Sequence, residues 1–134
     1  MMKKYLIYFT FIFIPIVCLS QNSEKRYYYC YYLEEPSTAK YSLDKDFRPL
    51  ACYTIVKSVD GGCVDNVHDR DLENVFYDYL RGKYGNELPY GNHYSKTFNS
   101  RKKAEESRLK SLGDLRKYHN YKLTELEYFN YYCD

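Results

Sequence analysis

The most constraining feature of this sequence is an unbroken run from Tyr27 to Leu33 (YYYCYYL), which contains no charged residue. Aromatic side chains favour the pleated, partly buried surface of a sheet, so the run predicts a first β-strand. Successive side chains of a strand point to opposite faces. The two resulting sets are Tyr27, Tyr29 and Tyr31 on one face and Tyr28, Cys30 and Tyr32 on the other. One face can pack beneath helices, and the other must meet solvent or a partner.

The N-terminal segment has the layout of a secretory signal peptide. Lys3 and Lys4 form a short basic region, and an almost uncharged apolar stretch runs from Tyr5 to Leu19. That stretch holds about 15 residues, fewer than the ~20 that a membrane-spanning helix needs. Cleavage is predicted after Ser20, so residues 1–20 are the expected signal peptide and residues 21–134 one mature domain without a stable membrane anchor.

Two alternatives to cleavage stay open. The apolar stretch can be retained as an anchor, or Cys18 can carry a lipid, although Val17 stands where a lipid-attachment site favours a small residue. Cleavage agrees better with the length of the stretch. We therefore expect an exported protein, periplasmic or extracellular.

Removal of residues 1–20 leaves an even set of cysteines, Cys30, Cys52, Cys63 and Cys133. An even number in an exported chain indicates disulfides, and the absence of a C-x-x-C pair argues against a metal site. Four cysteines allow three pairings. We expect Cys52 with Cys63, closing a short loop around Asp60-Gly61-Gly62, and Cys30 with Cys133.

The remaining patterns predict an α+β fold with the order β-β-α-β-α-β. Leu72, Val75, Phe76 and Tyr79 follow the i, i+3, i+4, i+7 spacing of one helical face, with Asp69 as a candidate N-cap and Gly82 or Gly85 as the stop. The expected strands cover 27–33, 51–59, 93–98 and 121–133, and the expected helices cover about 69–82 and 99–119. Such an order predicts one small domain, a mostly antiparallel sheet with both helices on one face.

The charge of the chain argues against nucleic acid as a partner. The sequence has 20 basic and 18 acidic residues, a formal net charge of +2. Lys3 and Lys4 account for that excess, so the mature domain is expected to be neutral. A neutral domain has no general attraction for a polyanion.

The tyrosines suggest a binding surface. The chain has 19 of them, and tyrosine supplies large, stiff contact area to interfaces. The candidate binding residues are Tyr28, Tyr32, Tyr128 and Tyr132. The alternative is purely structural, because a tyrosine ring can be buried while its hydroxyl reaches water or a polar partner.

Catalytic patterns are scarce in this sequence. It lacks G-x-S-x-G, H-E-x-x-H, a phosphate-binding glycine loop and an EF-hand. Asp65, His68, Asp69 and Asp71 form the best candidate cluster, for a hydrolase or a cation. Acidic residues at a helix start are also favoured by the helix dipole. We therefore expect no enzyme, no catalytic residue, no metal and no cofactor.

Residues 94–129 show one resemblance to a known family. A strand ends at Phe98, Asn99-Ser100 form a short polar turn, and a helix opens with Ala104-Glu105. This segment resembles one β-α-β half of a SPOR domain, a small fold that binds peptidoglycan. The resemblance implies binding of glycan strands on the sheet face.

Three functions follow from these observations. The leading hypothesis is a small exported protein that binds another protein, such as an inhibitor or an immunity-type partner. The alternative is SPOR-like binding of a cell-envelope glycan. A hydrolase that uses Asp65, His68 and Asp69 is the third.

Overall fold

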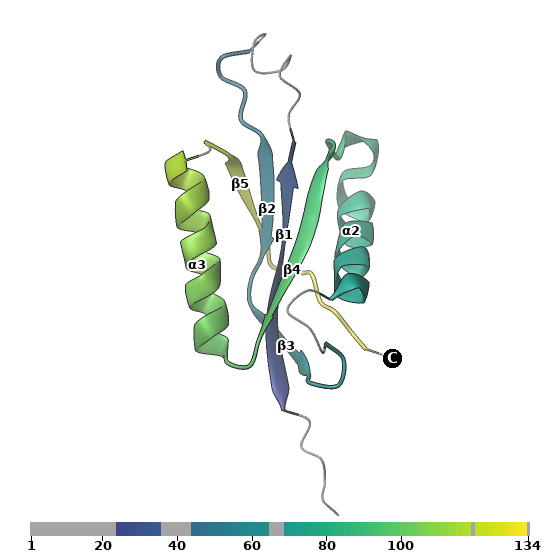
Figure 1. The fold of residues 1–134 in the computed structure, drawn as a ribbon. Coiled ribbons are helices and arrows are strands. Elements are labelled where there is room, and N and C mark those ends of the chain that lie inside the picture. Colours follow the sequence, from purple (N-terminus) through teal and green to yellow (C-terminus); the bar gives the residue numbers. More distant parts are fainter. Residues whose placement is uncertain (1–23, 36–43, 65–68, 119, 134) are drawn as a thin grey trace, which may run out of the picture.

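The computed structural model describes residues 24–35, 44–64, 69–118 and 120–133. It contains five strands and two α-helices within these ranges (Figure 1). The elements are β1 (Lys25–Glu34), β2 (Leu50–Thr54), β3 (Lys57–Asp60), α2 (Arg70–Tyr84), the 3-10 turn η1 (Gly85–Glu87), β4 (Gly91–Phe98), α3 (Arg101–Tyr118) and β5 (Lys122–Leu126). None of these helices combines the length and the hydrophobicity that crossing a membrane requires. The predicted signal peptide lies outside the described residues.

Strand β1 is the centre of the sheet. It pairs with β4 along one edge, from Tyr27 opposite Phe98 to Glu34 opposite Gly91. Its other edge is shared: the first half pairs with β3 and the second half with β2, all antiparallel. Strand β5 then pairs in parallel with β2. The α+β class and the mostly antiparallel sheet are confirmed.

Two expected strands are shorter than predicted. The segment expected as one strand over 51–59 is interrupted at Ile55 and Val56, which gives the order β-β-β-α-β-α-β. The last strand ends at Leu126, and the chain then leaves the sheet. Hydrophobicity alone misled the prediction here, because Phe129 and Tyr131 pack against the core without pairing within the sheet.

The two helices cover opposite faces of the sheet, so the prediction of both helices on one face is wrong (Figure 1). Leu72, Phe76 and Leu80 of α2 pack on the face that carries Tyr28, Cys30 and Tyr32. Ala104 and Leu115 of α3 pack on the face that carries Tyr29. The physical reason is that β1 is aromatic on both faces, and each apolar face needs its own cover.

Three tyrosines of β1, Tyr28, Tyr29 and Tyr32, are buried core residues with hydrogen-bonded hydroxyls. The Tyr29 hydroxyl lies 2.9 Å from the Ser107 hydroxyl of α3, and the Tyr32 hydroxyl donates to the carbonyl of Pro89. The Tyr28 hydroxyl accepts from the backbone N–H of Tyr131 at 2.8 Å. A buried tyrosine thus contributes apolar area without an unpaired polar group.

Helix α2 begins after the predicted N-cap and ends at Gly85, the later of the two predicted stops. Asp69 is its N-cap, and the Asp69 carboxylate accepts from the backbone N–H of Leu72 at 3.0 Å. Asp71 and Glu73 lie in the first turn, where the helix dipole favours acidic groups. Gly85 ends the helix with φ of 56°, a conformation that favours glycine.

The disulfide prediction is wrong in both number and pairing. The described residues contain one disulfide, Cys63–Cys133, while Cys30 and Cys52 are free and buried. Cys30 lies in the central strand beneath α2, and Cys52 belongs to the same buried core, whereas Cys133 is bonded to Cys63. Burial raises the pKa of both thiols, which keeps them protonated and unreactive in the fold.

Candidate functional site

The C-terminal tail, residues 127–133, crosses the α2 side of the sheet and is fixed there at three points. Phe129 is buried, with its ring edge-on to Phe76 at a centroid distance of 5.2 Å. Tyr131 donates its N–H to the Tyr28 hydroxyl, and Cys133 is bonded to Cys63. The tail is therefore a rigid part of the domain although it belongs to no strand.

A tight turn places Cys63 for this disulfide. The chain reverses after β3, with the N–H of Cys63 donating to the carbonyl of Asp60 at 3.0 Å. A Cβ at Gly61 would overlap the backbone carbonyl of Glu24, whereas Gly62 faces open space. Gly61 is thus required by a close approach to the start of β1.

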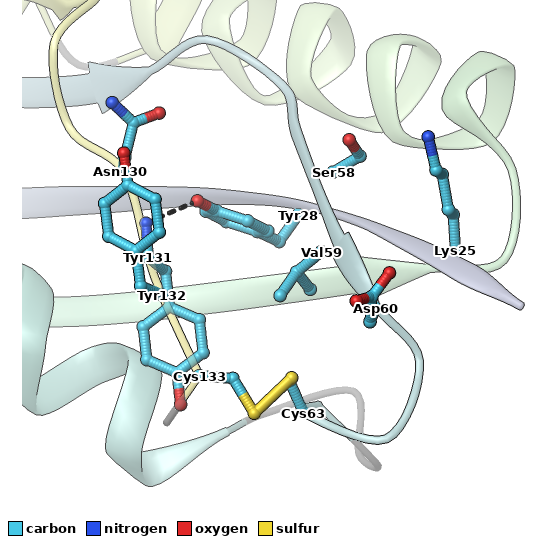
Figure 2. Close-up of a pocket in the computed structure, with 10 residues that line it drawn as sticks. All are labelled: Lys25, Tyr28, Ser58, Val59, Asp60, Cys63, Asn130, Tyr131, Tyr132 and Cys133. Atoms are coloured by element: carbon cyan, nitrogen blue, oxygen red, sulfur yellow. Dashed lines mark hydrogen bonds between the residues drawn. A yellow bond between two sulfur atoms is a disulfide. The ribbon is translucent and has the colours of Figure 1, made fainter. Parts of the chain in front are cut away.

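A groove of about 370 Å³ lies between β3 and the tail, and we call it the β3–tail groove (Figure 2). In Figure 2 the tail and β3 border it, the Tyr28 ring lies between them and the disulfide closes its end. Its lining residues are Lys25, Tyr28, Ser58, Val59, Asp60, Cys63, Asn130, Tyr131, Tyr132 and Cys133. The volume is at the small end of the ~300–1,000 Å³ that ligand pockets span.

The groove runs along the edge of β3 and not over one face. Ser58, Val59 and Asp60 are consecutive, and all three line it. Consecutive residues of a strand point to opposite faces. Lining by all three indicates a groove that passes the edge of β3, where backbone and side chains of both faces are within reach.

The lining groups are suited to binding. Lys25 and Asp60, which are paired in the β1–β3 register, supply opposite charges, and Ser58 and Asn130 supply neutral donors and acceptors. Burial raises the pKa of Tyr28 from 10.0 to about 12, so its hydroxyl stays neutral at ordinary pH. The lining therefore combines charged, neutral polar and aromatic groups around one opening.

The structure separates the four candidate tyrosines into two classes. Tyr28 and Tyr32 are each 1% exposed, and both belong to the core. Tyr128 and Tyr132 are 81% and 80% exposed. Of the exposed pair, Tyr132 lines the β3–tail groove and Tyr128 does not. Tyr28 also lines the groove, and Figure 2 shows its ring between the tail and β3.

The acidic cluster predicted from the sequence is not assembled within the described residues. Asp65 and His68 lie outside them, Asp69 is occupied as the N-cap of α2, and Asp71 is exposed in the first helical turn. No group of three potential metal ligands occurs in the part of the chain that the structure describes.

Sequence reasoning missed most of the groove. Lys25, Ser58, Asp60 and Asn130 are ordinary surface residues in the sequence, and only the fold brings them together. The available signal was the pair Cys63 and Cys133. A disulfide between them would have predicted that the end of the chain returns to the turn after β3.

Comparison with known proteins gives no relative. No family model matches the sequence, and neither the curated proteins nor the solved structures yielded a match.

Proposed function

We propose that this protein is a small exported binding protein and that it holds part of a partner protein in the β3–tail groove. The observation that carries the proposal is the groove itself: an open strand edge faces a tail that a disulfide fixes in place, with Tyr132 exposed at its border.

The rigidity of the tail favours binding. Ordering a loop or a side chain on association costs free energy, and a surface that is already fixed avoids that cost. Phe129 and the disulfide hold the tail before any partner arrives. Tyr132 is then presented as a large aromatic group with few rotatable bonds, the type of residue that is enriched at interface hot spots.

Export is the second part of the proposal. Disulfides persist in oxidising compartments and are rare in a reducing cytosol. The Cys63–Cys133 bond is consistent with such a compartment, and residues 1–20 have the layout of a signal peptide. Together they support a periplasmic or extracellular location.

Tyr128 and Tyr132 provide a matched pair for testing the groove. They are almost equally exposed and lie in the same tail, but only Tyr132 lines the groove. Residues 21–134, purified with the disulfide oxidised, would be immobilised and exposed to a solubilised envelope fraction. We expect one protein to be retained by the unchanged chain and by Tyr128→Ala, and lost with Tyr132→Ala.

Other results would change the proposed function. Equal retention by all three proteins would refute the groove as the binding site. Retained muropeptides in place of a protein would favour the alternative proposal of a SPOR-like glycan-binding function.

A further inference from the structure

We infer that the occupant of the β3–tail groove is an extended peptide segment that adds a strand to the outer edge of β3. This inference rests on the proposed function and specifies what the groove recognises.

The outer edge of β3 has no partner strand in the described part of the chain. Among the residues that the structure describes, strand β3 pairs only with β1. The neighbouring strand β2 is covered by β5, but β5 ends at Leu126, opposite Thr54 and before β3 begins. Strand β5 therefore covers the edge of β2 but not the edge of β3, where the groove lies.

An open edge is complementary to extended backbone. Alternate residues of β3 direct their N–H and C=O groups away from β1, and such groups are strong hydrogen-bonding partners. The Asp60 carbonyl is an exception as a free acceptor, because it already accepts from the N–H of Cys63. Because Ser58, Val59 and Asp60 line the groove in succession, a segment lying in it would run beside that backbone. Addition of a peptide strand to a sheet edge is a general mode of recognition.

The size of the edge favours a peptide over a second copy of this chain. Strand β3 has four residues, so at about 3.4 Å per residue its edge is only ~14 Å long. A specific interface between folded proteins needs roughly 1,000 Å² or more of buried surface. An edge this short cannot supply such an area, whereas a groove of about 370 Å³ can hold a few residues of an extended segment.

The residues on the two sides of the groove predict the pattern of side chains in a bound peptide. Val59 and Tyr131 border the core on the α2 side, and Tyr132 lies beside them in Figure 2. Ser58 and Asp60 occupy the positions on β3 that point to the opposite face, with Lys25 paired to Asp60. A strand in the groove would therefore place apolar side chains toward the tyrosines and polar side chains toward Lys25 and Asp60, in alternation.

A displayed library of linear peptides, selected on oxidised residues 21–134, supplies the probe. The best peptide would be synthesised, and its backbone nitrogens would be methylated one at a time. Each methyl group removes one N–H donor, so positions that face β3 should lose about tenfold or more in affinity. Positions that face away should change little, which gives an alternating pattern. Hydrogen exchange of the β3 amides should slow when the unmodified peptide is bound.

The outcomes separate this inference from the proposed function. A peptide that loses affinity with Tyr132→Ala but shows no alternating response to methylation would leave the groove as a binding site and refute strand addition. Failure to select any peptide that competes at the groove would also refute strand addition, while the envelope experiment decides independently whether the groove binds a protein. Tyr128→Ala should leave peptide affinity unchanged.

Discussion

Removal of the disulfide is the most informative perturbation of this fold. Cys63 and Cys133 are separated by 70 residues in the sequence, so the bond closes a long loop. Restricting a loop of that length in the unfolded chain stabilises the native state by roughly 4 kcal/mol in the chain-entropy treatment. The double substitution Cys63→Ser with Cys133→Ser should therefore lower the free energy of unfolding by about that amount.

The loss should be large in relation to total stability. Small domains have free energies of unfolding of about 5–15 kcal/mol, so ~4 kcal/mol is a substantial fraction. At roughly 4–5 °C for each kcal/mol in a domain of about 100 residues, Tm should fall by ~15–20 °C. Thermal unfolding followed by circular dichroism measures this shift. Reductant should lower the Tm of the unchanged chain similarly and leave the double variant unaffected.

Thiol chemistry supplies the control for pairing. Cys30 and Cys52 are buried, so a thiol reagent should label neither in the folded domain and both after denaturation. A peptide map without reduction should recover Cys63 joined to Cys133. A map that joins Cys30 to Cys133, or a Tm that reductant leaves unchanged, would refute the reasoning.

Three further predictions concern the turn at Gly61, the buried hydroxyl of Tyr28 and the buried side chain of Arg108. Gly61→Ala should destabilise the domain by about 1–3 kcal/mol in chemical denaturation, since its Cβ meets backbone, while Gly62→Ala should stay within ~0.5 kcal/mol. Stability should fall as the pH rises above 10.0, because burial raises the pKa of Tyr28 to about 12 and the unfolded chain releases that proton first; a denaturation midpoint that stays constant from pH 8 to about 11 would contradict this. Arg108→Ala should cost roughly 2–4 kcal/mol, because the buried Arg108 donates to the Thr54 carbonyl at 2.7 Å, while the exposed Arg101→Ala should cost less than ~1 kcal/mol.

The parts of the fold that depend on neighbouring residues could be predicted from the sequence. The cap of α2 at Asp69, its end at Gly85 and the two faces of β1 all follow from spacing within a few residues. Periodicity and capping act over one or two turns, so the sequence displays them directly. The same holds for α3, where the Ser100 hydroxyl accepts from the N–H of Lys103 at 3.1 Å.

The parts of the fold that depend on contacts between distant residues could not be predicted from the sequence. The placement of α3 against Tyr29 and of the tail against Tyr28 joins residues 78 and 103 positions apart. No local pattern specifies such contacts. One clue was present: the run over residues 27–33 has aromatic residues on both faces and no charged residue. Such a run is typical of a strand covered on both sides, which would have placed the helices on opposite faces.

The tyrosine-rich strand is explained by what the hydroxyl groups reach. A phenylalanine would fill about the same volume in the core, but it has no hydroxyl to form a hydrogen bond with a neighbouring segment of the chain. Tyr29 bonds to α3, Tyr32 to the Pro89 loop and Tyr28 to the tail. The central strand thereby fixes three separate segments of the chain around it. In the binding function that we propose, recognition depends on a tyrosine outside the core, Tyr132, which is exposed and lines the groove beside β3.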